Sequence, residues 1–402
     1  MFGIEIIKYS VKNLWNRKMR SFLTILSIFV GIVTIFIFIS FGWGLFNYVD
    51  EVTSGSSADK VLIQPRGGGI PGLDTTFALS DEEVEIVRKT PGVKEATGSS
   101  FKAVEVKKNK DQKYTFLISY DPDIPIIMDL FNVGIKKGRW LKSGDNNKVL
   151  AGYSYQVDNK IFPKALKVGD KLEVNGLDLD IIGFLESVGS PPDDAQIYVT
   201  EDFFDELYPE ESEISGWVIA RVEVRDIDKI VADIEKRLRN HRGLEEGKED
   251  FFVQSYDEMI EAYSSALNVI IGFVLLIAFV SIIVSAINTA NTMITSVLER
   301  IKEIGVMKAI GAKNSEIFNI FLLESFLLGL VAGIFGALVG WLISYFGGAL
   351  LQSLGYGFLS PYMPPILFIG CIAFASITGA VSGAFPAYQA SKTNVVDALR
   401  YE

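Results

Sequence analysis

Residues 266–297 have the sequence ALNVIIGFVLLIAFVSIIVSAINTANTMITSV, which contains no charged side chain. A bilayer core about 30 Å thick needs roughly 20 apolar residues in a helix, and this stretch is longer than that. Further uncharged runs occur over 22–49 and over 325–391, and the second of these is long enough for two spans. The sequence therefore predicts an integral membrane protein with four transmembrane helices. A cleaved signal peptide is disfavoured, because the first run exceeds the apolar region of such peptides.

The charges of the chain are segregated. Residues 50–261 carry a net charge of −15, whereas the rest of the chain carries +4, which together give the net charge of −11. The chain therefore combines membrane helices with an acidic soluble domain. The charge of that domain disfavours anionic partners, nucleic acid included.

Basic residues lie beside the spans in three places: before the first, between the second and third, and after the fourth. With four spans these clusters share one side, which the enrichment of Lys and Arg at the cytoplasmic face predicts to be the inside. Both termini are then inside, and the large domain is outside a cell (plasma or inner) membrane. The predicted spans cover 21–49, 263–298 (with a stalk), 318–350 and 365–388. The predicted cytoplasmic segments are a helix over 1–20, a helix over 299–315 and a tail over 389–402. The predicted outer segments are a domain over 50–262 and a short loop over 351–364.

The outer domain alternates between helix and strand patterns. Ser80-Asp81-Glu82-Glu83 is a capping box that begins a helix ending near Lys89. Residues 226–239 have one apolar helical face. Strands are expected over 60–64, 93–107 and 114–120 around the first helix, and over 217–224 and 251–254 around the second. This order predicts an α+β domain with a ferredoxin-like βαββ/βαβ core over 57–130 and 216–256, and a mainly-β subdomain inserted over 131–215.

Candidate catalytic and metal-binding residues are few. The aspartate pairs within 121–123 and 193–194 lack the spaced oxygen ligands of a calcium loop, and we interpret them as turn residues. The single histidine, His241, has no flanking motif of a hydrolase base. The single cysteine, Cys371, allows no disulfide within the chain. The sequence predicts no catalytic, cofactor or metal site.

The first twenty residues form an amphipathic pattern. Apolar side chains recur at helical spacing with lysines elsewhere, which predicts a helix in the membrane interface with its lysines toward anionic lipid. A simple cytoplasmic cap to the first span is the alternative. The residues assigned to this helix are Ile4, Ile7, Lys8, Val11, Lys12, Leu14 and Trp15.

The segment after the second span, residues 299–313, has the sequence ERIKEIGVMKAIGAK. It is a short charged helix, bounded by glycine, with an apolar stripe at Ile301, Ile304, Met307 or Lys308, and Ile310 or Gly311. Because it is tied to two spans, such a helix is suited to receive motion from a cytoplasmic partner.

This stretch, with residues 317–324 after it, resembles the most recognisable signature of the MacB/FtsX-like (LolC/LolE-type) ABC transporter permeases. Residues 14–31 and 385–400 resemble the family's first-span entry and C-terminal tail. In the outer domain, Gly138-Arg139-Trp140, Val168-Gly169-Asp170 and residues 181–184 are similar to its extracytoplasmic core. The resemblance covers nearly the whole chain.

The resemblance implies that residues 299–313 form a coupling helix that docks on an ATPase. The residues assigned to docking are Glu299, Arg300, Glu303, Ile304, Gly305, Met307, Lys308, Ala309, Gly311 and Ala312. The sequence has no G-x-x-x-x-G-K-[ST] loop, so we expect ATP and Mg²⁺ to be bound by a separate cytoplasmic ABC ATPase subunit. The chain itself is then a non-catalytic permease subunit of the mechanotransmission type.

The resemblance also implies pairing with a second permease subunit, in a homodimer or heterodimer, and cargo such as an extracytoplasmic protein or an amphiphile. Gly329, Gly333, Gly336 and Gly340 form two G-x-x-x-G pairs, which allow close helix approach either between subunits or within the chain. A membrane-anchored receptor or scaffold that regulates an extracytoplasmic partner without transport is the alternative function.

Overall fold

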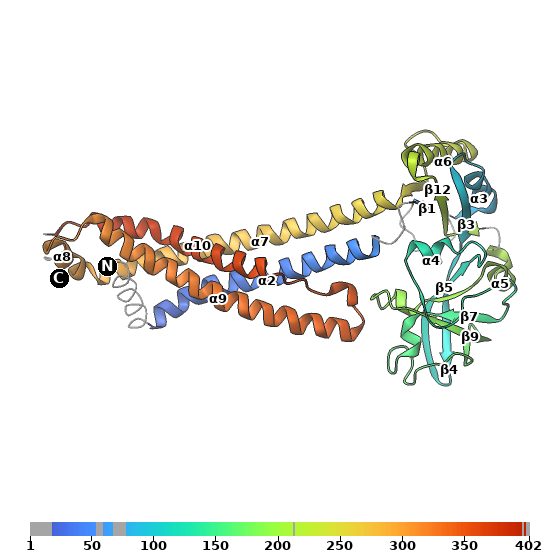
Figure 1. Ribbon diagram of the computed structural model, residues 1–402, viewed down its shortest axis with the longest axis horizontal. Helices are drawn as coiled ribbons and strands as arrows, with labels where there is room; N and C mark the ends of the chain where they lie inside the picture. Colours follow the sequence, from blue (N-terminus) through green and yellow to red (C-terminus); the bar gives the residue numbers. More distant parts are fainter. Residues whose placement is uncertain (1–17, 54–58, 67–77, 212–213, 396–397, 399–402) are drawn as a thin grey trace. The chain divides into compact units, whose positions relative to one another are not determined.

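The computed structural model describes residues 18–53, 59–66, 78–211, 214–395 and 398 (Figure 1). The chain divides into a helical unit, residues 1–45, 266–350 and 359–402, and an α+β unit, residues 46–265 and 351–358. The predicted interfacial helix lies outside the described residues, apart from its last three positions.

Within the residues that the structure describes, four helices are long and apolar enough to cross a membrane. They are α2 (Lys18–Thr53), α7 (Tyr256–Glu299), α9 (Asn314–Leu354) and α10 (Pro365–Lys392), with the short α8 (Ile301–Ala309) between α7 and α9. At the turn after α9, Gly355 has a φ of 101°, a left-handed conformation that favours glycine. The 3₁₀ turn Gly357–Leu359 then leads to α10, which has proline at its first position.

The four glycines of the G-x-x-x-G pairs pack within the chain. A Cβ on Gly333 would lie 2.8 Å from the Cβ of Ala375 in α10, and one on Gly340 would lie 2.8 Å from the Cβ of Phe36 in α2. Gly329 faces α10 in the same way, and Gly336 faces α2. Glycine therefore lets α9 approach both neighbours closely, which favours the intrachain reading of these pairs.

The α+β unit contains two larger sheets and a two-stranded pair, β2 (Leu79–Ser80) with β11 (Ile214–Ser215). The four-stranded sheet has the order β13-β1-β12-β3 with antiparallel neighbours. Its strands are β1 (Lys60–Pro65), β3 (Val93–Ser99), β12 (Trp217–Val222) and β13 (Phe251–Ser255). Two helices, α3 (Asp81–Arg88) and α6 (Ile227–Arg242), pack their apolar faces against it. The predicted capping box is present, since Ser80 accepts from the amide of Glu83 and Glu83 accepts from that of Ser80.

The seven-stranded sheet has the order β6-β9-β7-β10-β5-β4-β8, and it closes on itself because β8 also pairs with β9. Its strands are β4 (Phe101–Lys108), β5 (Asp111–Tyr120), β6 (Ile135–Gly138), β7 (Lys148–Ala151), β8 (Lys171–Val174), β9 (Leu177–Leu185) and β10 (Ile197–Thr200). The short helices α4 (Ile126–Leu130) and α5 (Glu201–Leu207) follow β5 and β10. A separate apolar core fills this sheet, with Tyr155, Phe162 and Phe204 among its large buried side chains.

The structure moves the predicted boundary of the insert. The expected continuous strand over 93–107 is divided at Ser100, where β3 ends in one sheet and β4 begins in the other. The division is fixed by hydrogen bonds, since the amide of Ser100 donates to Oγ of Ser119 at 2.9 Å and the Ser99 hydroxyl donates to the Ser119 carbonyl at 2.6 Å. Strands β4 and β5, assigned to the core from the sequence, therefore belong to the inserted part, which begins near residue 101 rather than 131.

Strand β13 leads into α7 without a loop. The Ser255 hydroxyl accepts from the amide of Glu258 at 3.2 Å, and the Glu258 carboxylate accepts from the amide of Ser255 at 2.9 Å. This reciprocal capping begins the helix directly at the strand end. The 44 residues of α7 give it a length of about 66 Å at 1.5 Å per residue, roughly twice the bilayer core.

Candidate functional site

The short helix α8 has well-defined ends. Arg300 is the N-cap residue, and Gly311 follows the last turn with a φ of 103°, a left-handed conformation that favours glycine. The amide of Ala312 donates to the Met307 carbonyl and that of Gly311 to the Lys308 carbonyl, both at 3.0 Å. These two bonds form a Schellman motif, so the helix ends where the sequence places its glycine.

Arg300 connects the start of α8 to α9. Its guanidinium donates to the Glu324 carboxylate at 3.1 Å, and both side chains are at most 5% exposed. It also donates to Glu303 at 3.1 Å and lies over the ring of Phe321 at 5.0 Å. A buried arginine held by a buried carboxylate fixes the orientation of both, because separating them would leave a charge without compensation.

The middle of α8 faces the helical unit. Ile304 is completely buried in a cluster with Val297 of α7, Phe321 of α9 and Ala387 of α10. Gly305 is also buried. The sequence assigned both residues to the docking surface, and the structure places them inside instead, because three long helices meet at this side of α8.

Lys308 connects α8 to the end of α10. Its ammonium group donates to the carbonyls of Ser391 and Thr393, each at 2.7 Å. The last carbonyls of a helix have no partner within it, and a lysine is a favourable donor to them. Lys308 is therefore a structural contact between two elements rather than a free surface charge.

The exposed side of α8 agrees with the predicted stripe only in part, because it includes Ile310 but not Ile304. Val306 is 51% exposed and Ile310 is 82% exposed, one turn apart on the same face. Lys302, Glu303, Ala309 and Lys313 are exposed beside them. The result is a small apolar patch within a ring of charges, on a helix whose other side is fixed; we call Val306, Ala309 and Ile310 the α8 patch.

The other predicted docking residues differ in how far they are exposed. Glu299 and Gly311 are exposed, whereas Met307 and Ala312 are half-buried. Sequence reasoning missed Glu324 and Val306 as members of the site. The position of Glu324, one residue before a long uncharged run, was the available signal for the first of these.

Among the described residues, no group of three His, Cys, Asp or Glu side chains is placed to hold a metal ion. The α+β unit does contain perturbed carboxylates at the start of α5. Burial raises the pKa of Glu201 to about 7, and the negative charges of Asp121 and Asp205 add to the rise. Burial likewise raises the pKa of Asp205 to about 6. Desolvation disfavours the charged form of a carboxyl group.

Two family models match the chain. Residues 21–237 match the MacB-like periplasmic core domain, and residues 275–395 match the FtsX-like permease C-terminal region.

Curated relatives align over nearly the whole chain. An uncharacterised ABC transporter permease of Methanocaldococcus jannaschii is 30% identical over 99% of this chain and 98% of its own length. The uncharacterised ABC transporter permease YknZ of Bacillus subtilis is 24% identical over 99% of both chains. The macrolide export ATP-binding/permease protein MacB of Marinobacter nauticus is 26% identical over 99% of this chain but only 61% of its own length.

Among solved structures, the extracellular domain of the ABC-type transporter YknZ matches 48% of this chain and 99% of its own length, with 15% identity and a TM-score of 0.39. The periplasmic region of MacB from Actinobacillus actinomycetemcomitans matches 54% of this chain and 97% of its own, with 15% identity and a TM-score of 0.41.

Proposed function

Because the chain belongs to the family of ABC transporter permeases with a MacB-like periplasmic core domain and an FtsX-like C-terminal region, we propose that a separate cytoplasmic ATPase docks on α8 and moves the extracytoplasmic domain. ATP and its Mg²⁺ bind to that ATPase. Both termini of the permease are then cytoplasmic, on the same side as α8.

The α8 patch is the observation that carries this proposal. An apolar patch on an otherwise polar surface is suited to a protein partner, and the charges around it fix the register of docking. The patch is not isolated from the spans, since Arg300 holds α8 to α9 and Lys308 holds it to α10. A displacement of α8 is therefore passed to the membrane helices instead of being absorbed by a loop.

Helix α7 is the second part of the proposed mechanism. It runs without a break from the capping box at Ser255 to Glu299, next to α8. A continuous helix of that length transmits displacement along its axis better than a strand joined by a loop. In this proposal α7 is the lever of a mechanotransmission complex, and β13 is the element of the outer domain on which it acts.

A second permease subunit completes the proposed assembly. The G-x-x-x-G glycines face neighbours within the chain, so they are not offered as the contact. Helix α7 instead leaves large apolar side chains exposed, among them Phe273 and Phe279. We assign part of that surface to the second subunit and the rest to lipid.

Co-purification tests the docking surface. With the full chain tagged and co-expressed with its ABC ATPase, Val306→Asp/Ile310→Asp should reduce ATPase recovery at least tenfold, since buried apolar anchors at an interface contribute about 1–3 kcal/mol each. The matched control is Ser315→Asp, an exposed position at the start of α9 outside the patch. Equal ATPase recovery with wild type, control and double variant, all eluting as folded protein, would exclude α8 as the docking helix.

A further inference from the structure

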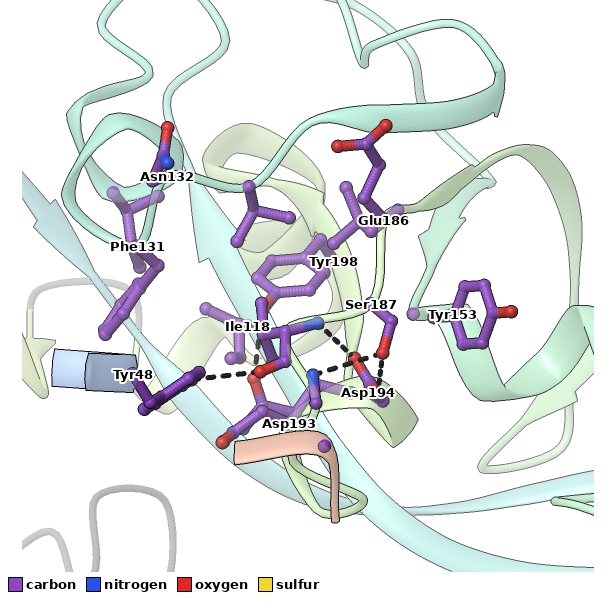
Figure 2. A pocket seen from close by; sticks show the side chains of 18 of the residues that line it. Tyr48, Ile118, Phe131, Asn132, Tyr153, Glu186, Ser187, Asp193, Asp194 and Tyr198 are labelled. Atoms are coloured by element: carbon purple, nitrogen blue, oxygen red, sulfur yellow. Dashed lines mark hydrogen bonds between the residues drawn. The ribbon is translucent and has the colours of Figure 1, made fainter. Parts of the chain in front are cut away.

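The α+β unit contains a cavity of about 620 Å³ that the proposed docking function does not use (Figure 2). Its size is that of pockets that bind small organic molecules. Its walls come from the loop over 186–194, from strand ends in both sheets, and from the first residues after α4. The cavity therefore lies where the two sheets of the unit meet.

Aromatic side chains form much of the lining. Phe101, Phe131, Tyr153, Tyr198 and Trp217 all contribute to it. The ring of Trp217 contacts that of Phe101 edge-on, with 4.8 Å between centroids, and lies 6.1 Å from that of Phe131. Figure 2 shows Tyr198 near the centre of the view, with Phe131 on one side and Glu186 and Tyr153 on the other. Such rings attract cations to their faces as well as binding apolar groups.

The charges at the cavity are of one sign. Glu186 and Asp193 line it with exposed carboxylates, and no Lys, Arg or His is among the described residues that line it. Asp194 has a different part, because it is buried and accepts hydrogen bonds from the Ser187 hydroxyl at 2.6 Å and the Val188 amide at 2.8 Å. These bonds fix the conformation of the loop over 186–194, which carries the exposed carboxylates of Glu186 and Asp193.

The lining also includes residues next to the membrane helices. Tyr48 lies one residue before the end of the apolar span Ser21–Val49, and its hydroxyl donates to the Val188 carbonyl at 2.9 Å. Gly357 comes from the segment between α9 and α10, and Tyr263 comes from α7. A tyrosine at the end of a span is typical of the lipid–water boundary. The cavity is therefore lined in part by residues that adjoin the apolar helices in sequence.

We propose that this cavity binds a cationic amphiphile, an organic ammonium or guanidinium group attached to an apolar body. The charged group is attracted by the two carboxylates that line the cavity, those of Glu186 and Asp193, which Figure 2 shows on opposite sides of Tyr198, and the apolar body contacts Phe131 and Trp217. An anionic amphiphile meets the same rings but is repelled by both carboxylates. The inference goes beyond the proposed function and does not depend on it, because binding here requires neither the ATPase nor α8.

Binding of a fluorescent cation tests the proposal. The full chain in nanodiscs of zwitterionic lipid is titrated against rhodamine 6G, with anionic fluorescein as the comparison, and fluorescence anisotropy gives Kd. Empty nanodiscs measure partition of the dye into lipid. We expect rhodamine 6G to bind at least tenfold more tightly than fluorescein.

Two variants locate the site. Glu186→Gln/Asp193→Asn should weaken rhodamine 6G binding roughly five- to twentyfold, since each carboxylate contributes a partly screened attraction. Phe131→Ala, at a 40% exposed side chain, should weaken it roughly three- to tenfold. The matched control, Asp178→Asn/Glu246→Gln, removes the same charge from exposed positions outside the cavity and should leave Kd within twofold.

The proposal is overturned if fluorescein binds as tightly as rhodamine 6G. It is also overturned if the control weakens binding as much as Glu186→Gln/Asp193→Asn, which would make the effect one of overall charge. Because all four substituted carboxylates are exposed, the variants should fold, and unchanged thermal midpoints verify this. None of these measurements includes an ATPase, so their failure leaves the docking proposal untouched.

Discussion

Replacing Glu324 with glutamine removes the negative partner of a buried arginine while keeping the length and shape of the side chain. In the wild-type protein the Arg300 and Glu324 side chains are 3% and 5% exposed, with 3.1 Å between nitrogen and oxygen. Removing one partner of such a pair altogether costs about 3–5 kcal/mol. Glutamine retains an oxygen that accepts from Arg300, so the expected cost is smaller, about 2 kcal/mol.

Glu303 provides a matched control, because it binds the same arginine at the same 3.1 Å but is 56% exposed. Exposed ion pairs contribute about 0–1 kcal/mol, since water and salt screen them. Glu303→Gln should therefore cost no more than about 0.5 kcal/mol. The two variants separate the effect of burial from the loss of one negative charge beside Arg300.

Hydrogen exchange measured by mass spectrometry tests this difference. A cost of about 2 kcal/mol raises the local opening equilibrium of α8 roughly 30-fold, and exchange of its amides rises accordingly. For Glu303→Gln we expect at most about a twofold rise. Peptides from α6 and β12, in the α+β unit, should exchange as in the wild type. The reasoning is wrong if Glu303→Gln and Glu324→Gln increase exchange in α8 equally, or if neither does.

Three further predictions concern other contacts. Lys308→Met should destabilise the end of α10 by about 1–3 kcal/mol through loss of two hydrogen bonds, detected as faster exchange at 388–395, and no change there would contradict the contact. Gly340→Val should lower the thermal midpoint because its side chain overlaps Phe36, at a cost of about 1–3 kcal/mol, whereas Gly347→Val has ordinary space and should be near neutral. Glu201 has a pKa raised to about 7 by burial, so the folded state binds its proton more tightly than the unfolded state, and its contribution to stability falls as pH rises from about 4.5 to about 7. Glu201→Gln should therefore have the same unfolding midpoint as the wild type at pH 5 and a higher one at pH 8. The difference at pH 8 corresponds to about 1–2 kcal/mol in the free energy of unfolding, after allowance for partial exposure. Equal midpoints at both pH values would contradict the burial of this carboxylate.

Local signals in the sequence were sufficient where a single element decides the structure. The capping box at Ser80 depends on four consecutive residues, and it is present as predicted. The apolar face of α6 follows from helical periodicity, and Ile230, Val231, Ile234 and Leu238 are buried. The long apolar runs likewise correspond to the four long helices, because length and hydropathy are properties of the run itself.

Features that depend on contacts distant in sequence were not predictable in the same way. Strands β3 and β4 follow each other closely in sequence, and their division at Ser100 depends on pairing with different sheets and on hydrogen bonds to Ser119, nineteen or twenty residues away. The apolar stripe predicted for α8 divides between two sides of the helix, since Ile304 is buried whereas Ile310 is 82% exposed. Periodicity shows that a helix has an apolar face, but not whether a partner or the chain itself covers that face.

The burial of Ile304 and the exposure of Val306 and Ile310 decide which substitutions can test ATPase docking on α8. Aspartate at Ile304 would disrupt a completely buried side chain and unfold the junction of α7, α9 and α10, so a loss of ATPase binding would not distinguish docking from folding. Aspartate at Val306 and Ile310 alters only exposed positions and leaves the contacts of Arg300 and Lys308 intact. If the proposed docking is correct, the exposed pair removes the ATPase without increasing exchange in α8, whereas Glu324→Gln increases exchange without altering the α8 patch. Reception of the ATPase and transmission to the helices are therefore separable in this chain by two variants, one on the exposed side of α8 and one at the α9 residue that binds Arg300.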